Sequence, residues 1–168
     1  MNMTKSRKIH YPLFLILTSI WWAWTVLVDM FIVRTIFSTV EDFFTAGNLG
    51  MVIFSQLNNL ELMVGSLIII VLAFESKYNR NVLWIFILSL LCWIVAIFYF
   101  SYLTPKLIEL SQLWKQSDLQ GITSAGLIND IQQEHQFYHR IYIGIDSLKL
   151  LILTVLIVFS TWKREKWN

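Results

Sequence analysis

The chain contains four apolar segments that are each long enough to cross a membrane as an α-helix. They cover residues 11–37, 50–74, 81–103 and 138–162. A hydrocarbon core about 30 Å thick needs about 20 helical residues, and every segment reaches that length. Membrane β-strands would instead alternate apolar and polar residues over about 10 positions, a pattern that these segments lack. The sequence therefore predicts an all-α fold, an integral membrane four-helix bundle.

Composition agrees with this class. The chain has 168 residues, of which 57% are hydrophobic and 14% charged, whereas soluble domains carry about 25% charged residues. The length suits one compact bundle, so residues 1–168 are predicted to form a single four-span domain. A net charge of +2 gives no reason to expect nucleic-acid binding. Because Cys92 is the single cysteine, no intramolecular disulfide is expected.

Basic residues near the ends of the segments predict the orientation. Lysine and arginine favour the cytoplasmic side of a membrane protein. They gather in both tails and in the connection between the second and third segments, as Lys5, Arg7, Lys8, Lys77, Arg80, Lys163, Arg164 and Lys166. We therefore expect a multi-pass protein of the plasma (inner) membrane with both termini in the cytoplasm.

The long connection at residues 104–137 has helical character of its own. Leu107, Leu110 and Trp114 recur at helical spacing, and so do Ile128 and Ile131. A glycine-containing break at residues 120–126 separates the two groups. We expect helices three and four to extend beyond the outer membrane surface as an antiparallel hairpin, with Pro105 as a kink or in the first turn of a new helix. The alternative is an amphipathic helix that lies flat on the membrane.

A stripe of polar residues runs along the fourth segment: His135, His139, Tyr142, Asp146 and Lys149. Their spacings of 4, 3, 4 and 3 keep them on one face of a helix. Ionisable groups within a membrane span normally face the bundle interior or a water-filled cavity. Counted from the ends of their own segments, Asp29 and Glu61 fall at a membrane depth that overlaps with that of Asp146 and Lys149.

These positions predict a polar intramembrane site made by helices one, two and four, with helix three as a mostly apolar wall. Its candidate residues are Asp29, Asn58, Glu61, His139, Tyr142, Asp146 and Lys149. Lys149 is expected to pair with Asp146 or Glu61, because an isolated ion at this depth would be unstable. Gly65 shares the face of Asn58 and Glu61 and would let two helices approach closely. The alternative is a network of buried ions that only fixes the packing of the helices.

Two histidines raise the question of a metal site. His135 and His139 stand at i and i+4, which places both on one helical face. They are the only candidates for a metal-ligating pair, and no E-x-x-H pair accompanies them, as a di-iron carboxylate bundle would require. No metal site and no cofactor are predicted. Because no nucleophile–base pair is evident either, we do not expect an enzyme.

Two short stretches have a counterpart in a known family. The first, YLTPKLIEL, begins at Tyr102, and the second, FYHRIYIGID, begins at Phe137. They resemble the small four-helix membrane family that includes transmembrane protein 205 and bacterial relatives with domains of unknown function. Thr104, Pro105 and His139 match that family's pattern, and the stretch at residues 46–50 is also similar. Tyr142 and Asp146 stand where the family is expected to have serine and asparagine. The resemblance implies a link to metal or drug tolerance or no assigned role, and no catalytic mechanism.

Two functions follow as expectations. The first is a membrane protein whose polar intramembrane site binds or passes a small cation or proton. The second is a non-catalytic membrane subunit or scaffold, whose buried ion pairs fix packing and whose outer hairpin docks a partner. The expected partners are the lipid bilayer and a second copy of the chain or a membrane protein.

Overall fold

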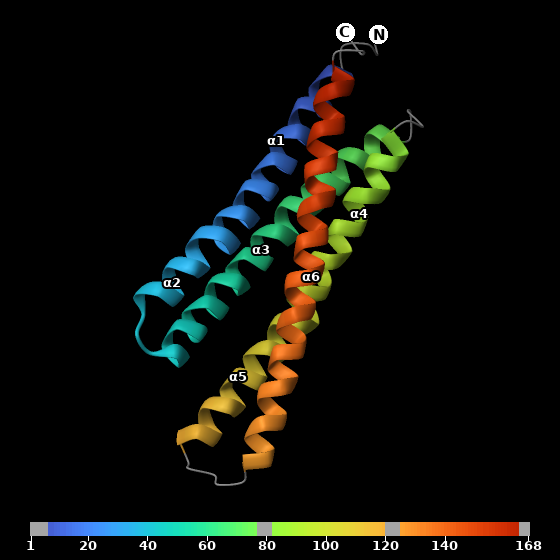
Figure 1. Ribbon diagram of the computed structural model, residues 1–168. Coiled ribbons are helices and arrows are strands. Elements are labelled where there is room, and N and C mark those ends of the chain that lie inside the picture. Colours follow the sequence, from blue (N-terminus) through green and yellow to red (C-terminus); the bar gives the residue numbers. More distant parts are fainter. Residues whose placement is uncertain (1–6, 77–81, 120–124, 165–168) are drawn as a thin grey trace.

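The computed structural model describes residues 7–76, 82–119 and 125–164, and these are almost entirely helical (Figure 1). The first helix comprises α1 (Arg7–Val26), a π-helical stretch (Leu27–Ile32) and α2 (Val33–Thr39). The second is α3 (Phe43–Ser76). The third comprises α4 (Leu83–Phe98), a π-helical stretch (Tyr99–Leu103) and α5 (Thr104–Leu119), and the fourth is α6 (Ala125–Arg164).

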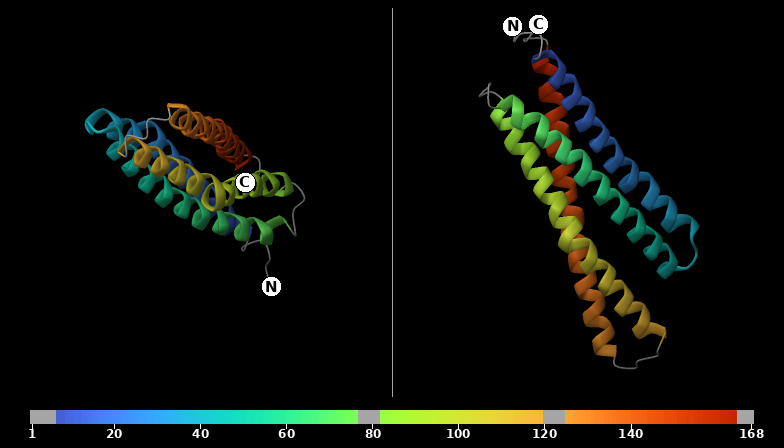
Figure 2. Two further views of the ribbon diagram at one scale, coloured as in Figure 1. Left: turned by 90° about the horizontal axis from the view of Figure 1, so that it is seen from below. Right: turned by 180° about the vertical axis from the view of Figure 1, so that it is seen from behind.

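The four helices form an antiparallel bundle in which each packs on two others. α1 contacts α3 and α6, while α4 contacts α3 and α6 as well. The start of α1 and the end of α6 lie at the same end of the bundle (Figure 1). We call this the terminal end, and we call the opposite end, where α5 leads towards the start of α6, the hairpin end. Towards the hairpin end the pair α2–α3 diverges from the pair α5–α6 (Figure 2).

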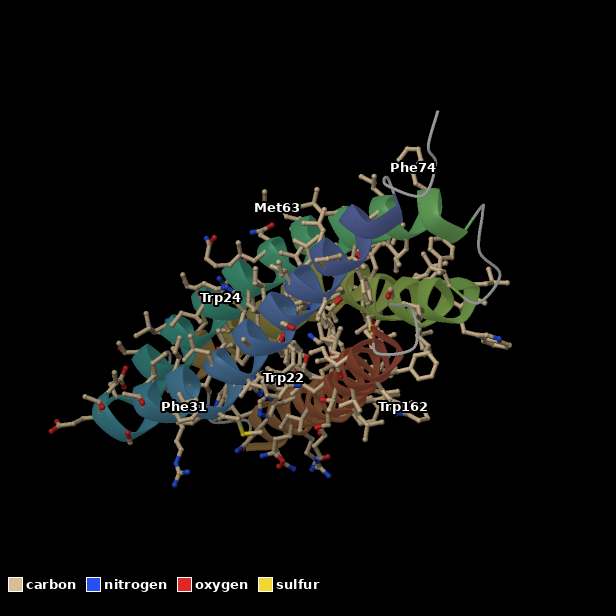
Figure 3. The ribbon with its side chains drawn as sticks, turned by 90° about the horizontal axis from the view of Figure 1, so that it is seen from above. Trp22, Trp24, Phe31, Met63, Phe74 and Trp162 are labelled. Atoms are coloured by element: carbon tan, nitrogen blue, oxygen red, sulfur yellow. The ribbon has the colours of Figure 1, made fainter. Side chains whose placement is uncertain are left out.

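All four helices are long and apolar enough to cross a membrane. The segments that meet this condition are Pro12–Thr39, Phe43–Phe74, Leu83–Ser117 and Ile128–Trp162. Their outer faces carry exposed apolar side chains such as Met63, Phe74 and Trp162 (Figure 3). The predicted all-α fold with four candidate spans is confirmed.

The start of the second helix differs from the sequence prediction. α3 begins at Phe43, seven residues before the predicted start at Gly50. The cause is Asp42, whose carboxylate accepts a hydrogen bond from the Thr45 backbone N–H at 2.7 Å and so caps the helix. Gly47 and Gly50 therefore lie inside the helix rather than in a loop.

The third helix continues past Pro105 without a break. The preceding stretch Tyr99–Leu103 is π-helical, and the Thr104 N–H bonds to the carbonyl of Tyr99. Pro105 follows this widened turn directly, and a proline within a continuous helix requires such a local change of backbone geometry because it cannot donate an N–H to the preceding turn. α5 and the start of α6 run antiparallel as predicted (Figure 1), and Lys106 Nζ links them at 3.7 Å to Glu134 Oε1. The predicted break at residues 120–126 lies mostly outside the described residues.

The interior contains two groups of buried apolar residues. The larger lies towards the terminal end and includes Trp21, Ile68, Cys92 and Leu153. The smaller lies towards the hairpin end and consists of Tyr99, Leu103 and Tyr142. Along α3 and α6 the buried charged residues fall between the two groups, so they form a polar layer across the bundle.

Candidate functional site

Lys149 is the centre of the polar layer. Its side chain is fully buried, and its Nζ lies 2.5 Å from Glu61 Oε1 on α3 and 2.5 Å from Asp146 Oδ1 on α6. The ring of Tyr99 lies below the ammonium group, 5.2 Å from Nζ to the ring centroid, in the geometry of a cation–π contact. The predicted pairing of Lys149 is confirmed, with both candidate carboxylates at once.

Two residues of the first helix, Thr25 and Asp29, also lie next to the ion pair. Thr25 Oγ1 lies 2.9 Å from Glu61 Oε1 and 3.0 Å from the carbonyl of Trp21, so its hydroxyl can donate to either. Asp29 is half-buried, and its carboxyl group is within hydrogen-bonding reach of the Asp146 carboxyl group. A hydrogen bond between two carboxyl groups requires that one of them carries a proton. The π-helical stretch Leu27–Ile32 contains Asp29, and such widened turns are frequent at functional sites.

Asn58 and Tyr142 lie at the hairpin side of the ion pair. Asn58 Nδ2 donates to Thr104 Oγ1 at 2.7 Å, while its Oδ1 is buried without a partner. The Tyr142 ring stacks on that of Tyr99 with 4.5 Å between centroids, and the Tyr142 hydroxyl is also buried without a partner. Each of these oxygens can therefore accept a hydrogen bond that no residue in the described part of the chain supplies.

The structure brings together six of the seven candidate residues: Asp29, Asn58, Glu61, Tyr142, Asp146 and Lys149. His139 is the exception, because its side chain is exposed and lies one turn further towards the hairpin end. The stripe thus faces the interior at Tyr142, Asp146 and Lys149, whereas His139 is exposed and lies at the wall of the cavity on the hairpin side of the polar layer.

The third helix contributes more than the predicted apolar wall. Tyr99 contacts Lys149 and donates a hydrogen bond to the backbone carbonyl of Tyr142 at 3.1 Å, and Thr104 accepts from Asn58. Sequence reasoning missed both because neither is charged. The Thr-Pro pair at residues 104–105 was the one available signal, since a proline within an apolar helix requires a local change of backbone geometry.

A cavity of about 370 Å³ adjoins the polar layer on its hairpin side. It lies where α2–α3 diverges from α5–α6 (Figure 2). Its wall contains six aromatic rings and two histidines, together with small polar residues: Val33, Phe37, Phe43, Phe44, Gly47, Gly50, Met51, Phe54, Thr104, Leu107, Ser111, Trp114, His135, His139 and Tyr142. The two histidines thus border a cavity that is lined largely by aromatic rings.

The histidines do not form a metal centre with other ligands. The rings of His135 and His139 stack with centroids 6.3 Å apart, and His135 also contacts Trp114. Among the residues that the structure describes, no three His, Cys, Asp or Glu side chains are placed to hold a metal ion together.

On the terminal side the polar layer meets closely packed apolar residues. Gly65 is essential to this packing, because a Cβ at this position would lie 2.7 Å from Trp93 and 3.1 Å from Trp21. The close approach predicted for Gly65 is therefore confirmed. Trp22 lies between α1 and α6, where its indole N–H donates to Thr154 Oγ1 at 2.9 Å (Figure 3).

Comparisons of the chain with protein family models, with curated proteins and with solved structures found no match.

Proposed function

We propose that this chain is a multi-pass membrane protein whose buried polar layer binds and passes protons. The observation that carries the proposal is an imbalance of charge. Three carboxyl groups, those of Asp29, Glu61 and Asp146, lie in the polar layer, whereas the described residues of this layer include one ammonium group, that of Lys149, which contacts Glu61 and Asp146. In a low-dielectric interior such an excess of negative charge is costly, and binding a proton removes part of it.

A proton fits this site better than a metal cation. Lys149 already occupies the position between Glu61 and Asp146 where a metal ion would have to bind. The carboxyl groups of Asp29 and Asp146, in contrast, are close enough to share a proton. The unpartnered hydroxyl of Tyr142 lies one turn from Asp146 and can accept or donate a hydrogen bond in a proton path.

The membrane arrangement is part of the proposal. We infer that the four apolar helices span the plasma (inner) membrane and that the terminal end faces the cytoplasm, as the basic tails indicate. α6 is 40 residues long, which corresponds to about 60 Å. Because a hydrocarbon core is about 30 Å thick, one end of α6 must extend beyond it. We place the α5–α6 hairpin outside the cell on this ground. Membership of the family that includes transmembrane protein 205 stays a prediction.

Infrared difference spectroscopy on the purified full-length protein in lipid nanodiscs tests the proposal. A protonated carboxyl group has a carbonyl stretching band that a carboxylate lacks, so a pH step should produce one such band in the wild type. The band should be lost in Asp29→Asn and retained in Asp130→Asn, a matched change on the exposed surface of the hairpin. In proteoliposomes, an imposed membrane potential should drive proton entry faster than in protein-free vesicles, and Asp29→Asn should abolish the difference.

A scaffold function is the second candidate. Leu113 and Phe137, on α5 and α6 of the hairpin, are 41% and 59% exposed, which provides apolar contacts for a partner protein. If the wild type shows neither the carboxyl band nor the proton entry, the buried ions serve packing alone and the scaffold is the correct function.

A further inference from the structure

The cavity next to the polar layer has the features of a binding site for a small organic molecule. Its volume of about 370 Å³ falls within the usual range of such sites. Six aromatic side chains line it: Phe37, Phe43, Phe44, Phe54, Trp114 and Tyr142. The rings of Phe54 and Tyr142 meet edge to face with 5.1 Å between centroids at the inner end.

On each of three helices, a residue that lines the inner end of the cavity lies one helical turn from a residue of the polar layer. Val33 lines the cavity, and Asp29 precedes it by four residues on the same face. In the same way Phe54 precedes Asn58, and Tyr142 precedes Asp146. A molecule in the cavity would therefore have its inner end about 5 Å from these polar groups.

The charged groups near the cavity indicate which class of ligand it can bind. The polar layer has an excess of carboxyl groups over ammonium groups, and aromatic faces attract cations. Lys106 on α5 lies close to the cavity, but Glu109 and Glu134 neutralise it at 3.4 and 3.7 Å. Anions are therefore disfavoured, and a cation is attracted by both the carboxyl groups and the aromatic faces, an attraction that a neutral molecule lacks.

We propose that the cavity binds a hydrophobic aromatic monocation, with its rings between α2–α3 and α5–α6 and its positive charge towards Asp29 and Asp146. The inference rests on the acidic polar layer of the proposed function. It goes further because it assigns a ligand to the aromatic cavity, which the passage of protons does not need.

Glycines provide a clean test of the site. Gly47 lines the cavity, and a Cβ at this position meets nothing within 4 Å. Gly47→Leu should therefore fill the cavity without disturbing the helix, where leucine is also the better helix former. Gly144→Leu is the matched control, because Gly144 is exposed on α6 and equally free of neighbours.

The probe is 4-phenyl-N-methylpyridinium, and 4-phenylpyridine, measured at a pH where it is uncharged, is its neutral counterpart. Equilibrium binding is measured on the full-length protein in lipid nanodiscs, with empty nanodiscs subtracted. The cation should bind saturably and about tenfold more tightly than the neutral compound, as expected for a desolvated cation–π contact of about 1.4 kcal/mol. Gly47→Leu should abolish this binding, and Gly144→Leu should leave it unchanged.

Asp29→Asn tests whether the carboxyl group attracts the cation. It removes one carboxyl group but keeps both partners of Lys149, so cation binding should weaken while binding of the neutral compound stays the same. Absence of saturable cation binding, equal affinity for the neutral compound, or binding that survives Gly47→Leu would each overturn the inference. The infrared band can still appear in those cases, because it depends on the carboxyl groups and not on the cavity.

Discussion

Lys149 Nζ lies 2.5 Å from Glu61 Oε1, so an ion pair joins α6 to α3 in the interior of the bundle. The two side chains are 0% and 1% exposed. Removal of one member of a buried pair leaves the other charge without compensation, which is much more costly than the loss of the contact itself.

Lys149→Met is therefore expected to lower the free energy of unfolding by about 3–5 kcal/mol. The measurement is unfolding in detergent, followed by circular dichroism. The double variant Lys149→Met/Glu61→Gln should recover part of the loss, because it neutralises one of the two carboxylates that lose their partner. Lys106→Met is the control, since its ion pairs are exposed and should contribute about 1 kcal/mol or less. A double variant no more stable than the single one would contradict the role of the pair.

Gly65→Ala should destabilise the bundle at the point where α1, α3 and α4 meet. The added methyl group would lie 2.7 Å from Trp93 Cδ1, so a tryptophan ring or a helix must shift. Overpacking of this kind costs about 1–3 kcal/mol. The same unfolding assay applies, with Gly144→Ala as control because that position is open. Equal stability of the two variants would show that Trp93 moves freely.

Tyr142→Phe separates stability from function. The Tyr142 hydroxyl is buried without a hydrogen-bond partner, so its removal should leave the free energy of unfolding unchanged or raise it. Proton entry into proteoliposomes should nevertheless slow down if the hydroxyl belongs to the proton path. A loss of stability on this change would indicate that the hydroxyl has a partner within the protein.

Asp42 should make the first turn of α3 sensitive to acid. Hydrogen bonds from the Thr45 hydroxyl, at 2.5 Å, and from its backbone N–H hold the pKa of the Asp42 carboxyl below its usual value. A lowered pKa in the folded state means that the stabilisation is present at neutral pH and is lost as the pH falls through that lowered value. The protection of the amides of residues 43–46 against hydrogen exchange, taken relative to the intrinsic exchange rate at each pH, should therefore fall in acid. Asp42→Asn keeps a capping oxygen without the charge and should remove this pH dependence.

Cysteine labelling tests the proposed orientation. Asn129→Cys, at an exposed position on the hairpin, should react with a membrane-impermeant maleimide added outside the cell. Asn168→Cys should react only after the membrane is opened. The native Cys92 is buried and provides a low background. Labelling of Asn129→Cys from the cytoplasmic side alone would reverse the orientation.

The sequence alone determined the class of fold and the composition of the polar layer. Four apolar segments of sufficient length fix four helices, because a backbone in lipid must satisfy its hydrogen bonds within each segment. Helical periodicity likewise placed Tyr142, Asp146 and Lys149 on one face, and the cost of burying ions predicted that Lys149 would be paired. These inferences required only the spacing of residues along one helix and the free-energy cost of removing an ion from water.

Tertiary structure alone decided which partners meet and where the bundle opens. Glu61 and Asp146 were equal candidates for Lys149 by sequence, and Lys149 contacts both because its side chain reaches from α6 to Glu61 on α3 while Asp146 lies one turn away on α6. Tyr99 and Thr104 enter the site only through the packing of α4 and α5 against α3 and α6. The aromatic cavity arises from the divergence of two helix pairs, and His139 is exposed for the same reason. Contacts between helices depend on their crossing angles and register, which the period within a single segment does not encode.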